Sequence, residues 1–212
     1  MTLSLSIPYL SYAEIGDISY KLLCKYGYHL TVPVPIEELL EFDLQINICL
    51  IDGLMEGFEI EAWTTSDLAI IQIDTYIFDH REQKARCILA HELGHIVLHK
   101  DVFESYKFRT TEEWKKFYTN VSDKSYAWLE SQAQNFAGLL LVPEMHLEAE
   151  FRRLVKENEL KFREAKEKDI PKDAYEDYFI DFVSTPLAET FNVTKEKIIR
   201  RIEKSNLKTL IP

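Results

Sequence analysis

Two histidines and a glutamate stand close together in the pentapeptide His91-Glu92-Leu93-Gly94-His95. The pentapeptide lies in an apolar run, and on a helix its two histidines would share one face, about 6 Å apart along the axis. Two imidazoles at that separation can converge on a single Zn²⁺. The carboxylate of Glu92 can then act as a base toward a water held at the metal. We therefore predict His91 and His95 as zinc ligands and Glu92 as the catalytic base.

A catalytic zinc site takes a third protein ligand besides two histidines. The three-histidine pattern H-E-x-x-H-x-x-G-x-x-H fails here, because its last two defined positions hold Leu98 and Asp101. The other common arrangement takes a glutamate from a later helix, and Glu130 is the natural candidate. The alternatives for this ligand are other acidic side chains: Glu144, Glu148 and the acids of residues 101–124.

Four more polar residues lie where they could support such a site. Gln134 follows Glu130 by one helical turn and is expected to hydrogen-bond the outer nitrogen of a ligating histidine. His99 is two turns from His91, about 12 Å along the axis, which favours hydrogen bonding or packing over ligation. For Tyr126 we expect core packing, with oxyanion stabilisation as the alternative. His146 is expected at the surface, with a role as a donor to substrate as the alternative.

The pattern ahead of the pentapeptide predicts a helix and then a small sheet. Ser11 and Glu14 have the spacing of a capping box, which starts a helix that ends near residue 26. Pro35 can open a second, short helix. Three segments rich in β-branched or alternating apolar residues follow: 46–51, 58–63 and 68–73. They predict a small, mainly antiparallel sheet, and the fold class is α+β.

Helices are predicted over much of the remaining chain. Asp79 is expected to cap a helix over residues 80–100 that carries the pentapeptide. Residues 101–124 lack a clear period and indicate a loop or excursion over the site. Further helices are predicted over 124–141, over 144–167 as one charged amphipathic helix, and as two short helices within 186–207. We expect a metallopeptidase domain over residues 1–183 and a C-terminal helical segment, 184–212, packed on it.

The composition is that of a folded, acidic protein. Its 212 residues suffice for one domain, and the net charge of −11 disfavours non-specific binding to nucleic acid. The three cysteines lie in apolar sequence and form neither a C-x-x-C pair nor a disulfide framework, which indicates buried free thiols in a reducing compartment. The first twelve residues carry no positive charge, and no apolar stretch is long enough to span a membrane. We therefore expect a cytoplasmic protein.

Two motifs together resemble a known family. The segment A-H-E-L-G-H-I-V-L-H (residues 90–99), followed by E-x-x-A-x-x-F-A-x-x-L-L-V-P (residues 130–143), is similar to the ImmA/IrrE family of metallopeptidases. The upstream sheet and residues 187–194 also resemble that family, so the likeness spans about residues 10–207. The chain departs from the pattern at Gln134, where the family usually has an acidic residue or an asparagine.

The resemblance implies a gluzincin-like, zincin-type fold and a zinc-dependent endopeptidase. Carried over by position, His91, His95 and Glu130 would be the metal ligands and Glu92 the base. The implied substrate is a partner protein, typically a helix-turn-helix transcriptional repressor or an antitoxin. The strand over residues 68–73 would be the edge strand that pairs with an extended peptide; the alternative is an ordinary sheet strand with no role in substrate binding.

Two other functions remain open from the sequence. The first is a binding module of the same fold that sequesters a repressor or antitoxin without cutting it. The complete H-E-x-x-H motif argues against this alternative, because it keeps the base Glu92, which a non-cleaving module does not need. The second is DNA contact by the basic residues of 195–208, which the net negative charge of the chain disfavours.

Overall fold

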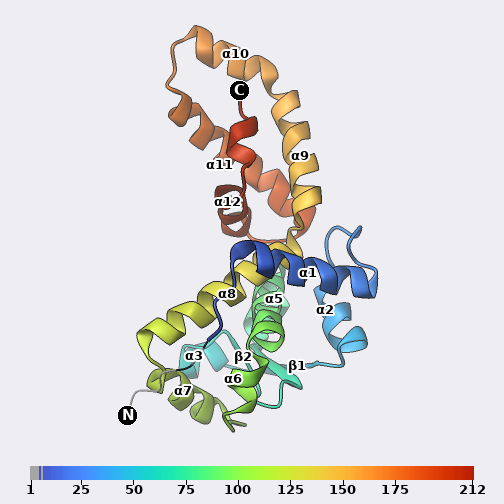
Figure 1. The fold of residues 1–212 in the computed structure, drawn as a ribbon, viewed down its shortest axis with the longest axis vertical. Helices are drawn as coiled ribbons and strands as arrows, with labels where there is room; N and C mark the ends of the chain where they lie inside the picture. Colours follow the sequence, from blue (N-terminus) through green and yellow to red (C-terminus); the bar gives the residue numbers. More distant parts are fainter. Residues whose placement is uncertain (1–4, 6) are drawn as a thin grey trace.

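A small sheet and a large set of helices form the fold in the computed structural model, which describes Leu5 and residues 7–212 (Figure 1). The strands are β1 (Asn47–Ile51), β2 (Ala62–Thr64) and β3 (Ile70–Asp74). The helices up to the end of the candidate site are α1 (Tyr12–Tyr26), α2 (Ile36–Glu38), the π-helical η1 (Leu39–Asp43), α3 (Leu54–Phe58), α4 (Thr75–His80), α5 (Glu82–Leu98), α6 (Lys100–Glu104), α7 (Thr111–Asn120) and α8 (Asp123–Leu141). The remaining helices are α9 (Glu144–Glu157), α10 (Glu159–Glu167), α11 (Lys172–Phe191), α12 (Lys195–Glu203) and the 3₁₀ turn η2 (Leu207–Leu210). The α+β class is confirmed, and in the described residues we find no helix with the length and apolar character needed to cross a membrane.

The sheet is mixed, so the prediction of a mainly antiparallel sheet is wrong. The strand order is β1-β3-β2, with β1 parallel to β3 and β2 antiparallel to β3. Because β3 lies between the other two strands, residues 68–73 do not provide an edge strand; the edges are β1 and β2. The chain between β1 and β3 is long enough for the crossover that parallel pairing needs. It contains α3, which occupies the start of the segment predicted as the second strand.

The helix with the pentapeptide begins later than the sequence predicts. Asp74, not Asp79, is the acidic cap, because its carboxylate accepts a hydrogen bond from the backbone N–H of Ile77 and so starts α4. Arg81 then leaves the helical conformation, at φ −137° and ψ 59°, and separates α4 from α5. The pentapeptide therefore lies in the C-terminal half of α5, which ends at Leu98.

Residues 101–124 are mostly helical, which corrects the expectation of a loop. They include α7 and most of α6, which lie at the sheet end of the molecule (Figure 1). Their aromatic side chains form a second apolar cluster with Trp63 of β2, whose members include Phe103, Phe108 and Phe117. These buried aromatic rings anchor residues 101–124 to the sheet, since each ring removes a large apolar surface from water.

The segment 144–167 is two helices, not one. Asn158 stands between α9 and α10, and its side-chain amide donates to the carbonyl of Leu154 at 2.8 Å. Phe162 of α10 then packs edge-on against Phe179 of α11, so the chain folds back on itself. These helices form the end of the molecule opposite the sheet (Figure 1). Helix α11 runs without interruption across residues 183 and 184, where the sequence placed a boundary.

Two helices have the bounds that the sequence predicts, and each has a local signal at its start. Helix α1 begins with the full Ser11–Glu14 capping box and ends at Gly27 in the left-handed conformation (φ 80°). Helix α8 is capped by Ser122 and ends two residues before Pro143. Both helices pack in the main core around α5.

Candidate metal centre

Helices α5 and α8 pack closely at the centre of the molecule (Figure 1). A methyl group added at Gly94 of α5 would stand 3.0 Å from the Cα atom and 3.1 Å from the carbonyl oxygen of Ala133 on α8. The backbones approach this closely because both helices have a small residue at the contact. The approach brings Glu130 of α8 to His91 and His95 of α5.

The three candidate ligands form a triangle of side chains in which Glu130 presents one oxygen to each histidine. His91 Nε2 lies 3.1 Å from His95 Nε2 and 3.3 Å from Glu130 Oε2, while His95 Nε2 lies 3.5 Å from Glu130 Oε1. Ligands bound about 2.0–2.1 Å from a tetrahedral zinc lie roughly 3.3 Å from one another. The triangle therefore has the size that a tetrahedral zinc requires, and within the described chain these are the ligand-type side chains that converge in this way.

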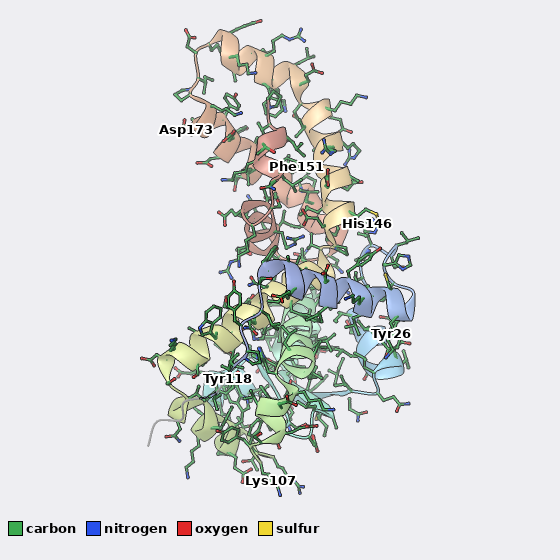
Figure 2. The ribbon with its side chains drawn as sticks, in the orientation of Figure 1. Tyr26, Lys107, Tyr118, His146, Phe151 and Asp173 are labelled. Carbon is green, nitrogen blue, oxygen red and sulfur yellow. The ribbon has the colours of Figure 1, made fainter. Side chains whose placement is uncertain are left out.

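Glu130 is negatively charged in this setting. Its burial favours the neutral acid, but its interactions with the two neighbouring imidazoles, His91 first, outweigh that effect and lower the pKa of Glu130 well below its usual range. The hydroxyl of Tyr118, from α7, donates to Glu130 Oε1 at 3.0 Å. Burial first, and then the charges of Glu130 and Glu92, raise the pKa of Tyr118 well above 10, so this phenol remains a donor. Figure 2 places Tyr118 at the sheet end of the molecule.

Glu92 lies beside the triangle and does not belong to it. Its side chain is buried, with 7% of the residue exposed, and its Oε2 atom accepts a hydrogen bond of 2.7 Å from the hydroxyl of Thr64. Thr64 belongs to the edge strand β2. One carboxylate oxygen is thus held by the sheet, which leaves the other for a reacting group in the cleft.

The outer nitrogen of His95 contacts His99, and not Gln134 as predicted. His95 Nδ1 lies 3.1 Å from His99 Nδ1, and His99 Nε2 lies 3.0 Å from Gln132 Oε1. Burial, followed by the neighbouring His95, lowers the pKa of His99 to about 3, so His99 is neutral. Gln134 instead accepts a hydrogen bond from Lys197 at 2.9 Å. The expectation of a hydrogen-bonding role for His99 agrees with this geometry.

The other candidates from the sequence lie elsewhere or have other partners. Glu144 pairs with the buried Arg201, and Glu148 pairs with Arg152 on its own helix. His146 lies near the start of α9 and contacts the carbonyl of His29, near the middle of the molecule and away from Tyr118 (Figure 2). Tyr126 is partly exposed and lines the cleft next to the triangle.

An open cleft of about 620 Å³ leads to the candidate ligands. It is lined by residues 59–62, which lead into the edge strand β2, and by side chains of α5. The other walls come from α7, α8 and α12. The side chains that line it include His91, Glu92, Glu130, Gln134, Trp114, Tyr126, Lys197 and Arg200.

The helix pair and its two-histidine, one-glutamate triangle are those of a zinc metallopeptidase-type domain, and the comparison with known families agrees. Residues 69–203 match the family Peptidase M78, described as the IrrE N-terminal-like domain. The match covers more than half of the chain, and the chain belongs to this family. The resemblance to ImmA/IrrE proteins is thereby confirmed. No curated protein matches the chain.

The sequence did not reveal three side chains that contact the candidate site residues. They are Thr64, Tyr118 and Gln132. Thr64 and Tyr118 belong to elements outside the two motifs, and no spacing relates them to the pentapeptide. Gln132 is on the predicted helix, but only the packing of α8 on α5 shows that it faces His99.

Proposed function

We propose that the protein is a zinc-dependent endopeptidase that cleaves a partner transcriptional repressor or antitoxin. The observation that carries this proposal is the triangle of His91, His95 and Glu130 with the buried carboxylate of Glu92 beside it. Two imidazoles and one carboxylate suit Zn²⁺, whereas Ca²⁺ and Mg²⁺ prefer oxygen ligands alone. When bound, the zinc would act as a Lewis acid toward the scissile carbonyl and lower the pKa of a water molecule.

The chain's own residues supply the proton transfers. Glu92 accepts the proton of the attacking water and then delivers it to the nitrogen of the departing amine. Thr64 holds one oxygen of that carboxylate and thereby orients the other. A carboxylate fixed to the rigid sheet keeps its geometry between the two transfers.

The substrate chain would bind in an extended conformation along β2. This strand is at the edge of the sheet and leads from the cleft wall at residues 59–62 to Thr64, the partner of Glu92. An extended peptide can pair with a strand edge through backbone hydrogen bonds. Ala62, Trp63 and Thr64 are buried, so the peptide would approach this edge through the cleft that residues 59–62 line.

Co-incubation with the product of a neighbouring repressor gene tests the proposed function. We expect cleavage of that repressor, loss of cleavage with a chelator, and recovery when Zn²⁺ is restored; gel analysis and mass spectrometry of the fragments measure all three. A stable complex with intact repressor, with or without chelator, would contradict the proposal and support the alternative of a sequestering module.

Lys197 gives the proposed cleft a preference for acidic side chains. Only 8% of Lys197 is exposed, its ammonium donates to the neutral Gln134, and among the described residues it forms no ion pair. Burial lowers the pKa of Lys197, which reflects the cost of a buried charge without a counterion. Arg200 of the same helix also lines the cleft, as do the acidic Glu196 of that helix and Glu59 and Glu61 ahead of β2. A carboxylate of the substrate at the Lys197 end would supply the missing counterion.

We expect the bonds cut by the wild-type protein to have Asp or Glu enriched at one flanking position. The measurement is mass spectrometry of a peptide mixture of known sequences after digestion. In Lys197→Met this enrichment is expected to fall about tenfold, which corresponds to the loss of one charged hydrogen bond. The matched control is Lys195→Met on the same helix, because Lys195 pairs with Asp181 and does not line the cleft. An unchanged profile in Lys197→Met would contradict the preference.

A further inference from the structure

We propose that Gln132 and His99 are positioning residues that set the tautomer of His95, so that His95 Nε2 presents its lone pair to the metal site. Three successive hydrogen bonds lead from a backbone carbonyl to His95 and fix the position of each proton. The functional role of this tautomer depends on the proposed zinc site, but the tautomer itself can be measured in the metal-free protein.

The first step fixes the orientation of the Gln132 amide. Gln132 Nε2 donates to the carbonyl oxygen of Pro8 at 2.9 Å, and a carbonyl can only accept. The amide nitrogen must therefore face Pro8, and Oε1 must face His99. Gln132 is 1% exposed, so the oxygen and the nitrogen of its amide depend on these protein partners.

The second step fixes the proton of His99. Because Gln132 Oε1 only accepts, His99 Nε2 must carry the hydrogen of the 3.0 Å contact. A neutral imidazole has one N–H, so His99 Nδ1 is then an acceptor. His99 is 2% exposed, and its two ring nitrogens meet His95 and Gln132, neither of which is an acid.

The third step fixes His95. The contact of 3.1 Å between His95 Nδ1 and His99 Nδ1 needs one donor, and His99 Nδ1 is an acceptor, so His95 Nδ1 carries the hydrogen. The lone pair of His95 is then on Nε2, which faces His91 and Glu130. The opposite tautomer would direct an N–H into the triangle and could not bind a metal there.

His91 lacks a comparable arrangement. Its Nδ1 atom is buried and has no hydrogen-bond partner among the described residues. The orientation of His91 therefore depends on the triangle itself, whereas His95 is held from behind by His99 and Gln132. This difference makes His95 the ligand that is already prepared for the metal.

The experiment combines nitrogen-15 NMR of the histidine rings with zinc titration of the full chain. In the metal-free wild type, we expect His95 to carry its proton on Nδ1. In Gln132→Met, which keeps the side-chain volume but removes the amide, we expect a mixture of His95 tautomers and zinc affinity about 10–100-fold weaker, the usual effect of losing such a partner. The matched control is Gln134→Met, whose amide bonds Lys197 instead and which should retain the wild-type tautomer and affinity.

Two results would overturn the inference: a wild-type His95 protonated on Nε2 in the metal-free protein, or equal zinc affinity in Gln132→Met and Gln134→Met. The wild-type spectrum decides the tautomer even if Gln132→Met does not fold. Failure of the proposed function would look different. In that case the wild type would show the Nδ1 proton on His95 but would bind no zinc or cleave no repressor.

Discussion

Glu92→Gln is expected to lower the rate of peptide cleavage by about 10²–10⁴-fold while zinc binding stays at the wild-type level, because a general base typically contributes that factor. The amide has nearly the shape of the carboxylate and can still accept the hydrogen bond from Thr64, so the cleft should keep its geometry. It cannot take a proton from water. The measurements are kcat/KM on the repressor substrate and the zinc content of the purified variant.

The partner variant for this test is His95→Ala, which removes a corner of the triangle. It is expected to lose both zinc and cleavage, because two protein ligands remain where a catalytic zinc normally has three. The two variants together separate the role of the base from the role of the metal ligand. Cleavage by Glu92→Gln at the wild-type rate would show that Glu92 is not the base.

The site residues predicted from the sequence share one property: each belongs to a sequence pattern that lies within a single helix, either α5 or α8. His91, Glu92 and His95 follow from helical spacing alone, and Glu130 follows from the second motif. The error concerns Gln134. Helical periodicity shows which residues of α8 share a face with Glu130, but it does not show how α8 crosses α5. In the structure that crossing turns Gln132 toward His99, and Gln134 toward Lys197.

The fold shows the same division between local and distant interactions. Helix α1 could be predicted because its cap, Ser11, is next to the residues that it caps, and the end of α8 could be predicted because Pro143 follows it closely. The pairing of the strands could not be predicted, because it joins residues far apart in the chain, such as Asn47 and Ile70. Strand pairing depends on such partners more than on the local residue types.

Gly94→Ala tests whether the close approach of α5 and α8 is needed for both stability and metal binding. The new methyl would stand 3.0 Å and 3.1 Å from backbone atoms of Ala133, and 3.3 Å from Phe136 Cβ. Backbone atoms of a packed helix cannot rotate away, so the two helices must separate or strain. Such overpacking typically costs about 1–3 kcal/mol.

Gly16→Ala is the matched control, because a methyl at Gly16 of α1 meets only the Leu139 side chain at an ordinary 3.6 Å. Both replacements gain about 1 kcal/mol of helix propensity, so the difference between them measures the steric cost. From urea unfolding we expect Gly94→Ala to be less stable than Gly16→Ala by about 2 kcal/mol. Zinc affinity should also fall in Gly94→Ala alone, because Glu130 would move away from His91 and His95. Equal stability and equal zinc affinity in the two variants would show that this contact does not set the geometry of the triangle.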